Sequence, residues 1–291
     1  MGKSYPIGNP REIRKLCGLH SGKSRADLGR EIKENWSRIQ VRAMASGFKN
    51  WIPTLPNSLE ILGTSTKVEK SRKLKTKTKI QYLNPGRQSG IELCGFRCSG
   101  CTGGCLGNTA SRLRMFSGKN SKTWKTMLLI GDPVRYFSLL QIEIDSHIRS
   151  CHRDGIAPSL RLDGSSDTGM ADALSEIFPD CIFYDYTKSR FRMNRFLDGS
   201  FSDNRHLTFS RSSKNHDASL DILNRGGSVA VPVLQDKSDW PSEWQGFPVY
   251  DATETDARFW DSPGWQFLTW VGPKSDHAEK SGFLVNLGES R

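Results

Sequence analysis

Short apolar strands recur at regular intervals through the second half of the chain, and this spacing restricts the possible folds more than any other feature. Six such stretches occur, at 159–167, 181–190, 206–213, 228–233, 247–256 and 265–274. Their starts lie about 18 to 25 residues apart with helical or irregular sequence between them, which is typical of repeated βα units. We therefore predict an α/β fold whose parallel strands form a partial TIM-like (βα) barrel.

The carboxyl ends of these strands carry polar residues that we expect to form the functional site. In parallel α/β folds the loops that follow the strands meet at one edge of the sheet, and active sites lie there. We expect one shared pocket built from Arg161, Asp163, Asp167, Asp185, Lys188, Ser210, Arg211, Asp251, Asp256 and Lys274.

The first 56 residues are expected to form a separate, basic helical part. Pro10 can begin a short helix that ends near Gly18, and a longer amphipathic helix is expected from Ser24 to Gly47. We predict that this helical appendage and its linker, 1–56, pack as an amphipathic hairpin on the main domain, 57–291, although their basic residues also allow nucleic-acid binding.

Two more helices are expected before the repeated strands. They cover 109–116 and 133–153, and Asp132 followed by Pro133 is a good start for the second. His147 and Cys151 are four residues apart on this helix and therefore share a face. We expect them to form a surface pair, because two ligands do not make a metal site.

A glycine-rich loop, Leu93–Asn108, contains four of the seven cysteines: Cys94, Cys98, Cys101 and Cys105. The odd number of cysteines and the lack of an apolar signal segment at the start favour a reducing compartment, where a disulfide knot is not expected. Thiolates gathered on such a loop hold zinc or an iron–sulfur cluster. We predict all four cysteines as candidate metal ligands.

The chain carries a formal net charge of +11, which favours a polyanionic partner such as nucleic acid, although a generally basic surface would give the same value. A run of basic residues extends from Lys67 to Lys79, and the pattern from Lys73 to Tyr82 predicts a hairpin arm that leads into a strand at 80–83. The run either is a solvated face or contacts phosphates beside the cysteine loop. No apolar stretch approaches the roughly 20 residues of a membrane span. We expect a cytoplasmic protein.

Several motifs in a fixed order show a resemblance to a known family. They are LGTSTKVEK, IQYLNPGRQSG, the cysteine loop, LRLDGSSD, FYDYTKSR, LTFSRS, the pattern of Asp251, Asp256, Arg258 and Phe259, and GPKSDHAEKSGFLV. From about Leu62 to Val285 the chain resembles the phage gene-product-88 domain family, which implies action in a host cytoplasm. The family's cysteine pattern, C-x6-C-x3-C, matches Cys94, Cys101 and Cys105.

The additional cysteine creates a second pattern. Cys94, Cys98 and Cys101 have the spacing C-x3-C-x2-C and in this resemble radical S-adenosylmethionine enzymes. That resemblance implies a [4Fe–4S] cluster with one iron open to S-adenosylmethionine, on a loop after the first strand of a partial barrel. The glycine-glycine-glutamate segment of those enzymes is absent. Four cysteine ligands would instead give a closed cluster or a zinc site.

Our leading hypothesis is a radical S-adenosylmethionine-like enzyme that acts on a nucleotide or nucleic acid. A cation would bind the carboxylate of the cosubstrate, and an aspartate would hold its ribose hydroxyls. The predicted catalytic residues are Asp163, Asp185, Lys188 and Arg211, and the predicted cofactor-binding residues are Arg161, Asp167 and Ser210.

Two alternatives remain open. One is a non-catalytic nucleic-acid-binding protein with a structural zinc or closed iron–sulfur site. The other is metal-dependent hydrolysis at Asp163, Asp167 and Asp185, with the cysteines forming a separate structural site.

Overall fold

A computed structural model describes the chain except for residues 1–8, 20–21, 110, 272–279 and 289–291. Lys274 and most of the GPKSDHAEKSGFLV motif therefore lie outside the described residues. Within the described part of the chain, no helix has both the length and the apolar character needed to cross a membrane.

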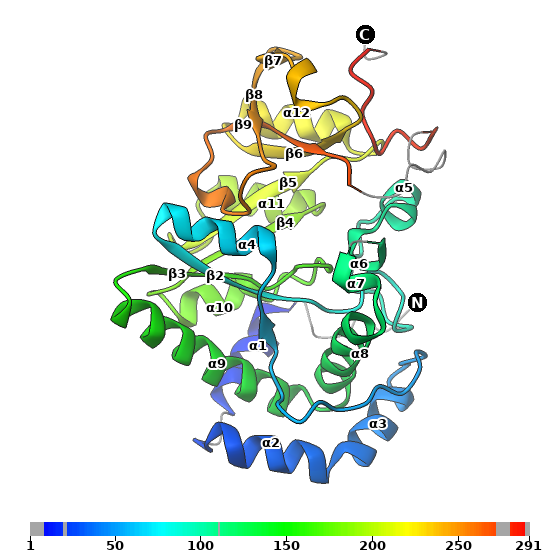
Figure 1. Cartoon of the computed structure of the whole chain (residues 1–291), viewed down its shortest axis with the longest axis vertical. Coiled ribbons are helices and arrows are strands. Elements are labelled where there is room, and N and C mark those ends of the chain that lie inside the picture. Colours follow the sequence, from blue (N-terminus) through cyan, green and yellow to red (C-terminus); the bar gives the residue numbers. More distant parts are fainter. Residues whose placement is uncertain (1–8, 20–21, 110, 272–279, 289–291) are drawn as a thin grey trace.

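The described residues form a nine-stranded sheet in the order β1-β2-β3-β4-β5-β6-β9-β8-β7 (Figure 1). The strands are β1 Leu62–Gly63, β2 Thr76–Gln81, β3 Ala157–Arg161, β4 Ile182–Thr187, β5 Arg205–Ser210, β6 Ser228–Val233, β7 Glu243–Trp244, β8 Phe247–Asp251 and β9 Gly264–Thr269. Neighbouring strands are parallel, except at the two edges where β1 pairs with β2 and β7 with β8. The protein therefore has a mixed α/β fold with a mostly parallel sheet. Among the described strands, β1 and β7 form its two edges.

All six predicted strand stretches contain a strand, and β2 to β6 lie side by side in chain order. This order follows from crossover connections of one hand, which place their helices on the same face of the sheet. On β4, Phe183 contributes to the hydrophobic core on that helix-covered face. Tyr184, the next residue, points to the opposite face and contacts Phe259 at a ring distance of 5.2 Å. The two faces therefore hold different clusters of side chains.

The helices are α1 Pro10–Gly18, α2 Arg25–Glu34, α3 Trp36–Ala45, α4 Thr66–Glu69, α5 Ser99–Gly103, α6 Leu106–Thr109, α7 Ser111–Arg114, α8 Phe116–Gly131, α9 Pro133–Arg153, α10 Ala171–Ile177, α11 Arg190–Leu197 and α12 His216–Asn224. Three 3-10 turns are η2 Lys70–Leu74, η3 Lys237–Asp239 and η4 Arg258–Trp260. The helix predicted at 133–153 is confirmed as α9, and the Asp132 carboxylate accepts the Arg135 amide at its start.

The helix predicted at 109–116 has the wrong bounds. The structure has the shorter helix α7 within this range and a longer helix, α8, that begins at Phe116 and was not predicted. Residues 122–131 of α8 are all buried, so this helix has no solvent-exposed face along most of its length. A helix that is buried all round lacks the amphipathic period that predicts a helix from sequence.

The N-terminal helices pack on the main domain, as predicted. Ile13, Ile32 and Ile39 belong to the same hydrophobic core as the buried residues of α8 and α9. The single helix expected from Ser24 to Gly47 is two helices, α2 and α3, which meet at Asn35. The Asn35 side-chain amide donates a hydrogen bond to the Glu31 carbonyl, which ends α2.

The basic run of 67–79 does not form a hairpin arm. Its residues fold into α4, η2 and β2, and the Lys77 ammonium lies 3.4 Å from the Asp154 carboxylate. The exposed cations before β2 lie at the amino end of that strand, whereas the cysteine loop follows its carboxyl end. Because six strand residues rise about 20 Å, the run does not lie beside the loop.

Candidate metal centre

The cysteine loop lies over the carboxyl ends of β2 and β3. The Gln81 carbonyl, at the end of β2, accepts the amide of Gly164 in the loop after β3, at 3.0 Å. The Asp167 amide in that loop donates to the Leu93 carbonyl at 2.8 Å, and the Cys94 thiol lies 3.7 Å from the Ser165 carbonyl. The loop is therefore fixed at the edge of the sheet where sites occur in parallel folds.

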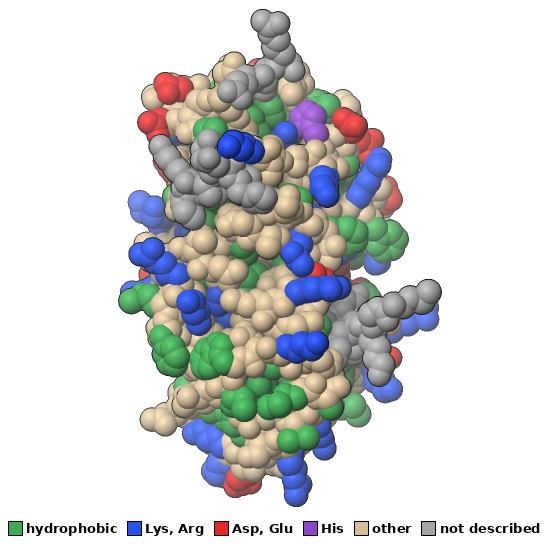
Figure 2. Space-filling view, turned by 90° about the vertical axis from the view of Figure 1, so that its right-hand side faces the viewer, with side chains coloured by type: hydrophobic (Ala, Val, Ile, Leu, Met, Phe, Trp, Pro, Cys, Tyr) green, Lys and Arg blue, Asp and Glu red, His purple; other side chains and the backbone are tan. Residues whose placement is uncertain are grey.

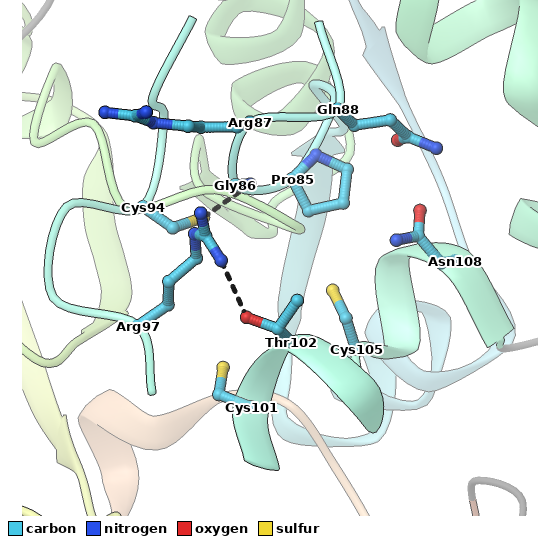
Figure 3. A pocket seen from close by; sticks show the side chains of 10 residues that line it. All are labelled: Pro85, Gly86, Arg87, Gln88, Cys94, Arg97, Cys101, Thr102, Cys105 and Asn108. Atoms are coloured by element: carbon cyan, nitrogen blue, oxygen red, sulfur yellow. Dashed lines mark hydrogen bonds between the residues drawn. The ribbon is translucent and has the colours of Figure 1, made fainter. Parts of the chain in front are cut away.

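A cavity of about 290 Å³ opens within this loop. It is lined by Pro85, Gly86, Arg87, Gln88, Cys94, Arg97, Cys101, Thr102, Cys105 and Asn108. Figure 3 shows the sulfur atoms of Cys94, Cys101 and Cys105 around one space, with the Arg97 side chain between the first two. The structure thus brings three of the four predicted metal ligands to one cavity.

Cys98 is not part of this lining. Its side chain is 5% exposed, and its sulfur accepts the Cys101 amide at 3.3 Å, which caps the start of α5. The three cysteines at the cavity have the spacing C-x6-C-x3-C. The spacing C-x3-C-x2-C requires Cys98, which does not line the cavity.

Burial raises the pKa of all three cavity thiols, that of Cys94 to about 12. The Gly86 amide opposes this effect by donating to the Cys94 sulfur at 3.2 Å, the Lys188 charge lowers the pKa of Cys101, and the Lys122 charge lowers that of Cys105. At neutral pH the thiols therefore stay protonated until a cation compensates their charge, so metal binding would release protons.

Glu92 organises the charged side of the cavity. Its carboxylate accepts the Arg97 guanidinium at 3.0 Å and the Cys94 amide at 3.0 Å, and it lies 3.3 Å from Arg87. Arg97 also donates to the Thr102 hydroxyl at 2.8 Å. Sequence reasoning missed these residues, although charged side chains in an otherwise neutral glycine-rich loop were a visible signal.

Two glycines of the loop allow close packing against the C-terminal segment. A Cβ atom at Gly104 would lie 2.5 Å from the Trp270 ring, and one at Gly100 would lie 2.1 Å from the Ser281 hydroxyl. No other residue fits these positions without displacing its neighbour. The glycines therefore seat α5 against the chain that follows β9.

The predicted carboxylates form a buried network on the helix-covered face. Asp163 accepts the Gly169 amide, the Ser166 hydroxyl and both the amide and hydroxyl of Thr168. Asp185 accepts the Asp163 amide at 2.8 Å and lies 3.2 Å from the Arg205 guanidinium. These contacts hold the loop after β3 against the sheet.

Asp167 belongs to the same network. Its carboxylate accepts the Thr187 hydroxyl and the Lys188 amide, and lies 2.5 Å from the Arg192 guanidinium. Among the described residues, no group of three or more His, Cys, Asp or Glu side chains is arranged to hold a single metal ion. The carboxylates accept hydrogen bonds from protein donors that hold the loop, and their catalytic and cofactor-binding roles stay predictions.

Lys188, Ser210 and Arg211 connect the ends of β4 and β5 to the C-terminal segment. The Lys188 ammonium donates to the Ser210 hydroxyl at 2.5 Å and lies 5.5 Å from the centre of the Phe283 ring. Arg211 donates to the Gly282 carbonyl at 3.1 Å. Of these three, Lys188 acts electrostatically on a cavity cysteine.

Arg161 lies on the opposite face of the sheet. Its guanidinium is 2.7 Å from the Asp256 carboxylate and 4.6 Å from the centre of the Tyr186 ring. Lys67 also pairs with Asp256, and Arg258 pairs with Asp261 at 2.7 Å. The strand-end residues therefore do not all meet in one pocket, because Arg161 and Asp256 form an ion cluster on the opposite face of the sheet from Asp163, Asp167 and Asp185.

The expected surface pair on α9 is also wrong. His147 and Cys151 are buried between the helix and the sheet. The His147 Nε2 atom lies 3.1 Å from the Lys77 carbonyl and 3.2 Å from the Ser159 carbonyl, so the ring joins α9 to β2 and β3. Burial lowers the pKa of His147 to about 4 and keeps the ring neutral.

Comparisons with known proteins agree with the resemblance found in the motifs. The model of the family described as gene product 88 matches residues 59–286. No curated protein and no solved structure matches the chain. The family match begins after α1–α3 and covers the sheet and the cysteine loop. Because it spans well over half of the chain, this protein belongs to the gene product 88 family.

Proposed function

We propose that this protein is an iron–sulfur enzyme of the radical S-adenosylmethionine-like type, acting on a nucleotide or nucleic acid in the cytoplasm of an infected host. In this proposal Cys94, Cys101 and Cys105 bind a [4Fe–4S] cluster. One observation carries it: these three thiols line one cavity, and Cys98 does not. Three protein ligands leave a fourth coordination position free.

The donor set of the cavity fits a cluster better than a single zinc ion. Zinc needs its sulfur ligands about 2.3 Å from one point. Here the three sulfurs border a cavity of about 290 Å³, which suits a group that each thiolate binds at a different iron. The Gly86 amide, which donates to the Cys94 sulfur, is the kind of contact that tunes the potential of cluster ligands.

The chain's own residues offer cations for an anionic cosubstrate beside the cysteines. A [4Fe–4S] cluster with an open iron supplies the electron that cleaves S-adenosylmethionine. The Arg87 guanidinium at the cavity can bind a carboxylate or phosphate in two-pronged fashion, and Glu92 limits its freedom. Lys188, near Cys101, adds a second positive charge from the end of β4.

We further infer that the sheet is a partial (βα) barrel around this loop. Two features support this inference: β2 to β6 follow one another in chain order, and the loop that follows β2 carries the cysteines. Loops at the carboxyl ends of barrel strands are where catalytic residues collect.

Anaerobic purification followed by iron, sulfide and zinc analysis tests the metal assignment. We expect about four iron atoms per chain in the wild type and their loss in Cys105→Ala, because that change removes a ligand. Cys98→Ser is the matched control, since a serine hydroxyl still caps α5. It should retain the cluster.

The electron paramagnetic resonance spectrum of the reduced cluster tests the open iron. We expect the spectrum to change when S-adenosylmethionine is added. Stoichiometric zinc without iron, or loss of the metal in Cys98→Ser as well, would instead indicate a closed four-cysteine site. An iron signal indifferent to S-adenosylmethionine would restrict the cluster to a structural or electron-transfer role.

A further inference from the structure

Two stretches of the chain contain basic residues and no acidic ones. Residues 35–59 and 93–131 have no Asp or Glu and together carry nine Lys or Arg. The remainder of the chain then has 33 of the 42 Lys and Arg to set against all 31 Asp and Glu. The two stretches therefore contribute +9. Residues 70–91, which also lack acidic side chains, contribute a further +7, and the rest of the chain is net acidic.

Folding places both stretches together. The helices α3 and α8 pack so closely that a Cβ atom at Gly131 would lie 2.3 Å from the Ile39 carbonyl. The Lys49 amide donates to the Ser89 carbonyl at 2.9 Å, which joins the segment after α3 to the loop that lines the cysteine cavity. Both stretches reach the side of the molecule that carries α5 to α8 (Figure 1).

An exposed pair of stacked aromatic rings lies on this side. Trp51 and Phe116 have ring centres 5.4 Å apart at an angle of 29°, and their side chains are 39% and 71% exposed. The Asn120 side chain accepts the Thr54 amide at 2.9 Å and donates to the Thr54 carbonyl at 2.7 Å. These two bonds fix the segment that holds Trp51 against α8.

Exposed cations flank the rings. Arg112 and Arg114 on α7, and Lys119 on α8, are exposed, and none of them pairs with a described acidic side chain. α7 approaches α8 closely, because a Cβ atom at Gly118 would lie 2.1 Å from the Arg112 carbonyl. Figure 2 looks onto this side and shows Lys and Arg side chains spread over it among hydrophobic ones.

We propose that this surface binds single-stranded nucleic acid. We call it the stacking face and define it as Trp51, Phe116, Arg112, Arg114 and Lys119. Unpaired bases stack on the two aromatic rings, and the cations contact the phosphates. A duplex hides the faces of its bases, and a protein partner would not by itself require exposed stacked rings flanked by cations that pair with no described acidic side chain.

The stacking face also gives the proposed enzyme its substrate class. The loop 85–90 lines the cysteine cavity and is joined by hydrogen bonding to the segment that carries Trp51. A strand held on the stacking face therefore passes beside the cavity. This second step rests on the proposed function, whereas binding of the strand does not.

Fluorescence anisotropy with a labelled 20-nucleotide thymidine or uridine strand tests the surface, using the full chain. We expect Trp51→Ala with Phe116→Ala to weaken binding about tenfold or more, because each lost platform removes base stacking. Arg112→Gln with Arg114→Gln should lower the slope of log affinity against log salt by about 1.4, at about 0.7 per phosphate contact.

Matched controls lie on other parts of the molecule. Phe191→Ala removes an exposed aromatic ring on α11, and Arg72→Gln with Lys73→Gln removes two exposed cations at the far end of β2. Both should bind like the wild type. Equal weakening in these controls, or binding of duplex as tight as that of a single strand, would overturn the proposal. So would the finding that the protein binds no strand and instead forms a dimer that is lost when Trp51 and Phe116 are replaced.

A parallel titration of Cys105→Ala separates this inference from the proposed function. Strand binding should persist there, because the stacking face contains no cluster ligand. A chain that binds the strand but holds no iron would refute the enzyme proposal and leave the stacking face standing. An iron-containing chain that binds no strand would refute the stacking face and leave the iron–sulfur assignment unaffected. Circular dichroism confirms that each variant is folded.

Discussion

At the scale of single residues, the network under the loop after β3 places several charges out of water. Asp185 is buried together with the Arg205 guanidinium, which lies 3.2 Å from it and 2.9 Å from Asp172. Burial raises the pKa of Asp185 to about 7, whereas the Arg192 and Arg205 charges lower the pKa of Asp172 to about 2. One arginine is therefore shared by two carboxyls whose pKa values shift in opposite directions.

Because of the Asp185 carboxyl, we expect the stability of the fold to fall as the pH rises. Its pKa is higher in the folded chain than the ordinary value of 3.8, so the stabilisation that it contributes is full below about pH 4 and is lost as the pH rises towards 7. Asp185→Asn removes this loss, because the amide oxygen still accepts the Asp163 amide.

We expect the melting temperature of Asp185→Asn relative to the wild type to rise between pH 4 and pH 7. The corresponding change in unfolding free energy is up to about 4 kcal/mol, at 1.36 kcal/mol per pKa unit. Melting curves at several pH values measure it. Asp180→Asn, at an exposed position, is the control and should show no such trend. A constant difference across this range would contradict the assignment.

Residue types were predictable at this scale, but their partners were not. Spacing marked all four cysteines as candidate ligands, yet it does not show that the Cys98 sulfur accepts the Cys101 amide outside the cavity while Cys105 lines it. The aspartates in the short loop after β3 likewise suggested a site for a metal or cofactor. Its carboxylate is taken up by the amides and hydroxyls of its own loop, a local preference of aspartate in turns.

At the scale of elements, the position of α5 depends on a glycine that faces an aromatic ring. Gly104→Ala would place a methyl group 2.5 Å from the Trp270 ring, so the helix or the C-terminal segment has to move. We expect a loss of about 1–3 kcal/mol in unfolding free energy and weaker retention of iron, because Cys101 and Cys105 flank this contact. Chemical denaturation and iron analysis measure both effects.

Gly95→Ala is the matched control for this variant. It lies in the same loop, and a Cβ atom there would meet nothing within 4 Å. It should keep both the stability and the iron content of the wild type. Equal losses in the two variants would show that the loop tolerates no added methyl group, which would remove the specific role of the Trp270 contact.

Elements with a strong local signal were predictable from the sequence. Asp132 and Pro133 at the start of α9, and the short apolar stretch of β6, placed both elements at their observed bounds. The helix α8 was missed because its burial on all sides removes the period that marks a helix. The basic run of 67–79 looked like an arm, but Val68 is fully buried and docks α4 onto β2.

At the scale of the whole molecule, the N-terminal helices are part of the main core although they precede the family match. Ile39→Ala, on α3, should lower the unfolding free energy by about 2–5 kcal/mol, because it leaves a cavity against α8. Val41→Ala is the control, since this neighbouring side chain is 66% exposed and should cost little. Urea denaturation compares them; similar small costs would show that α3 is only loosely attached.

The parallel sheet was predictable at this scale because its strands recur at even intervals. The distribution of the strand-end residues between the two faces of the sheet was not predictable. Arg161 and Asp163 are two residues apart, yet one lies on each side of the sheet, in different ion networks. A polar residue at a strand end shows only that it is near the edge. Its face depends on where the strand stops, which the sequence alone does not fix.

The charge of the stacking face also has a consequence for how the protein would meet the strand that we propose it binds. The stretches 35–59 and 93–131 carry nine Lys or Arg and no acidic residue, so they add positive charge to the side of α5 to α8. A polyanion in solution will turn the protein as it approaches, so that first encounters already occur in the productive orientation. Association should therefore be fast at low ionic strength and slow steeply as salt is added, before any contact has formed.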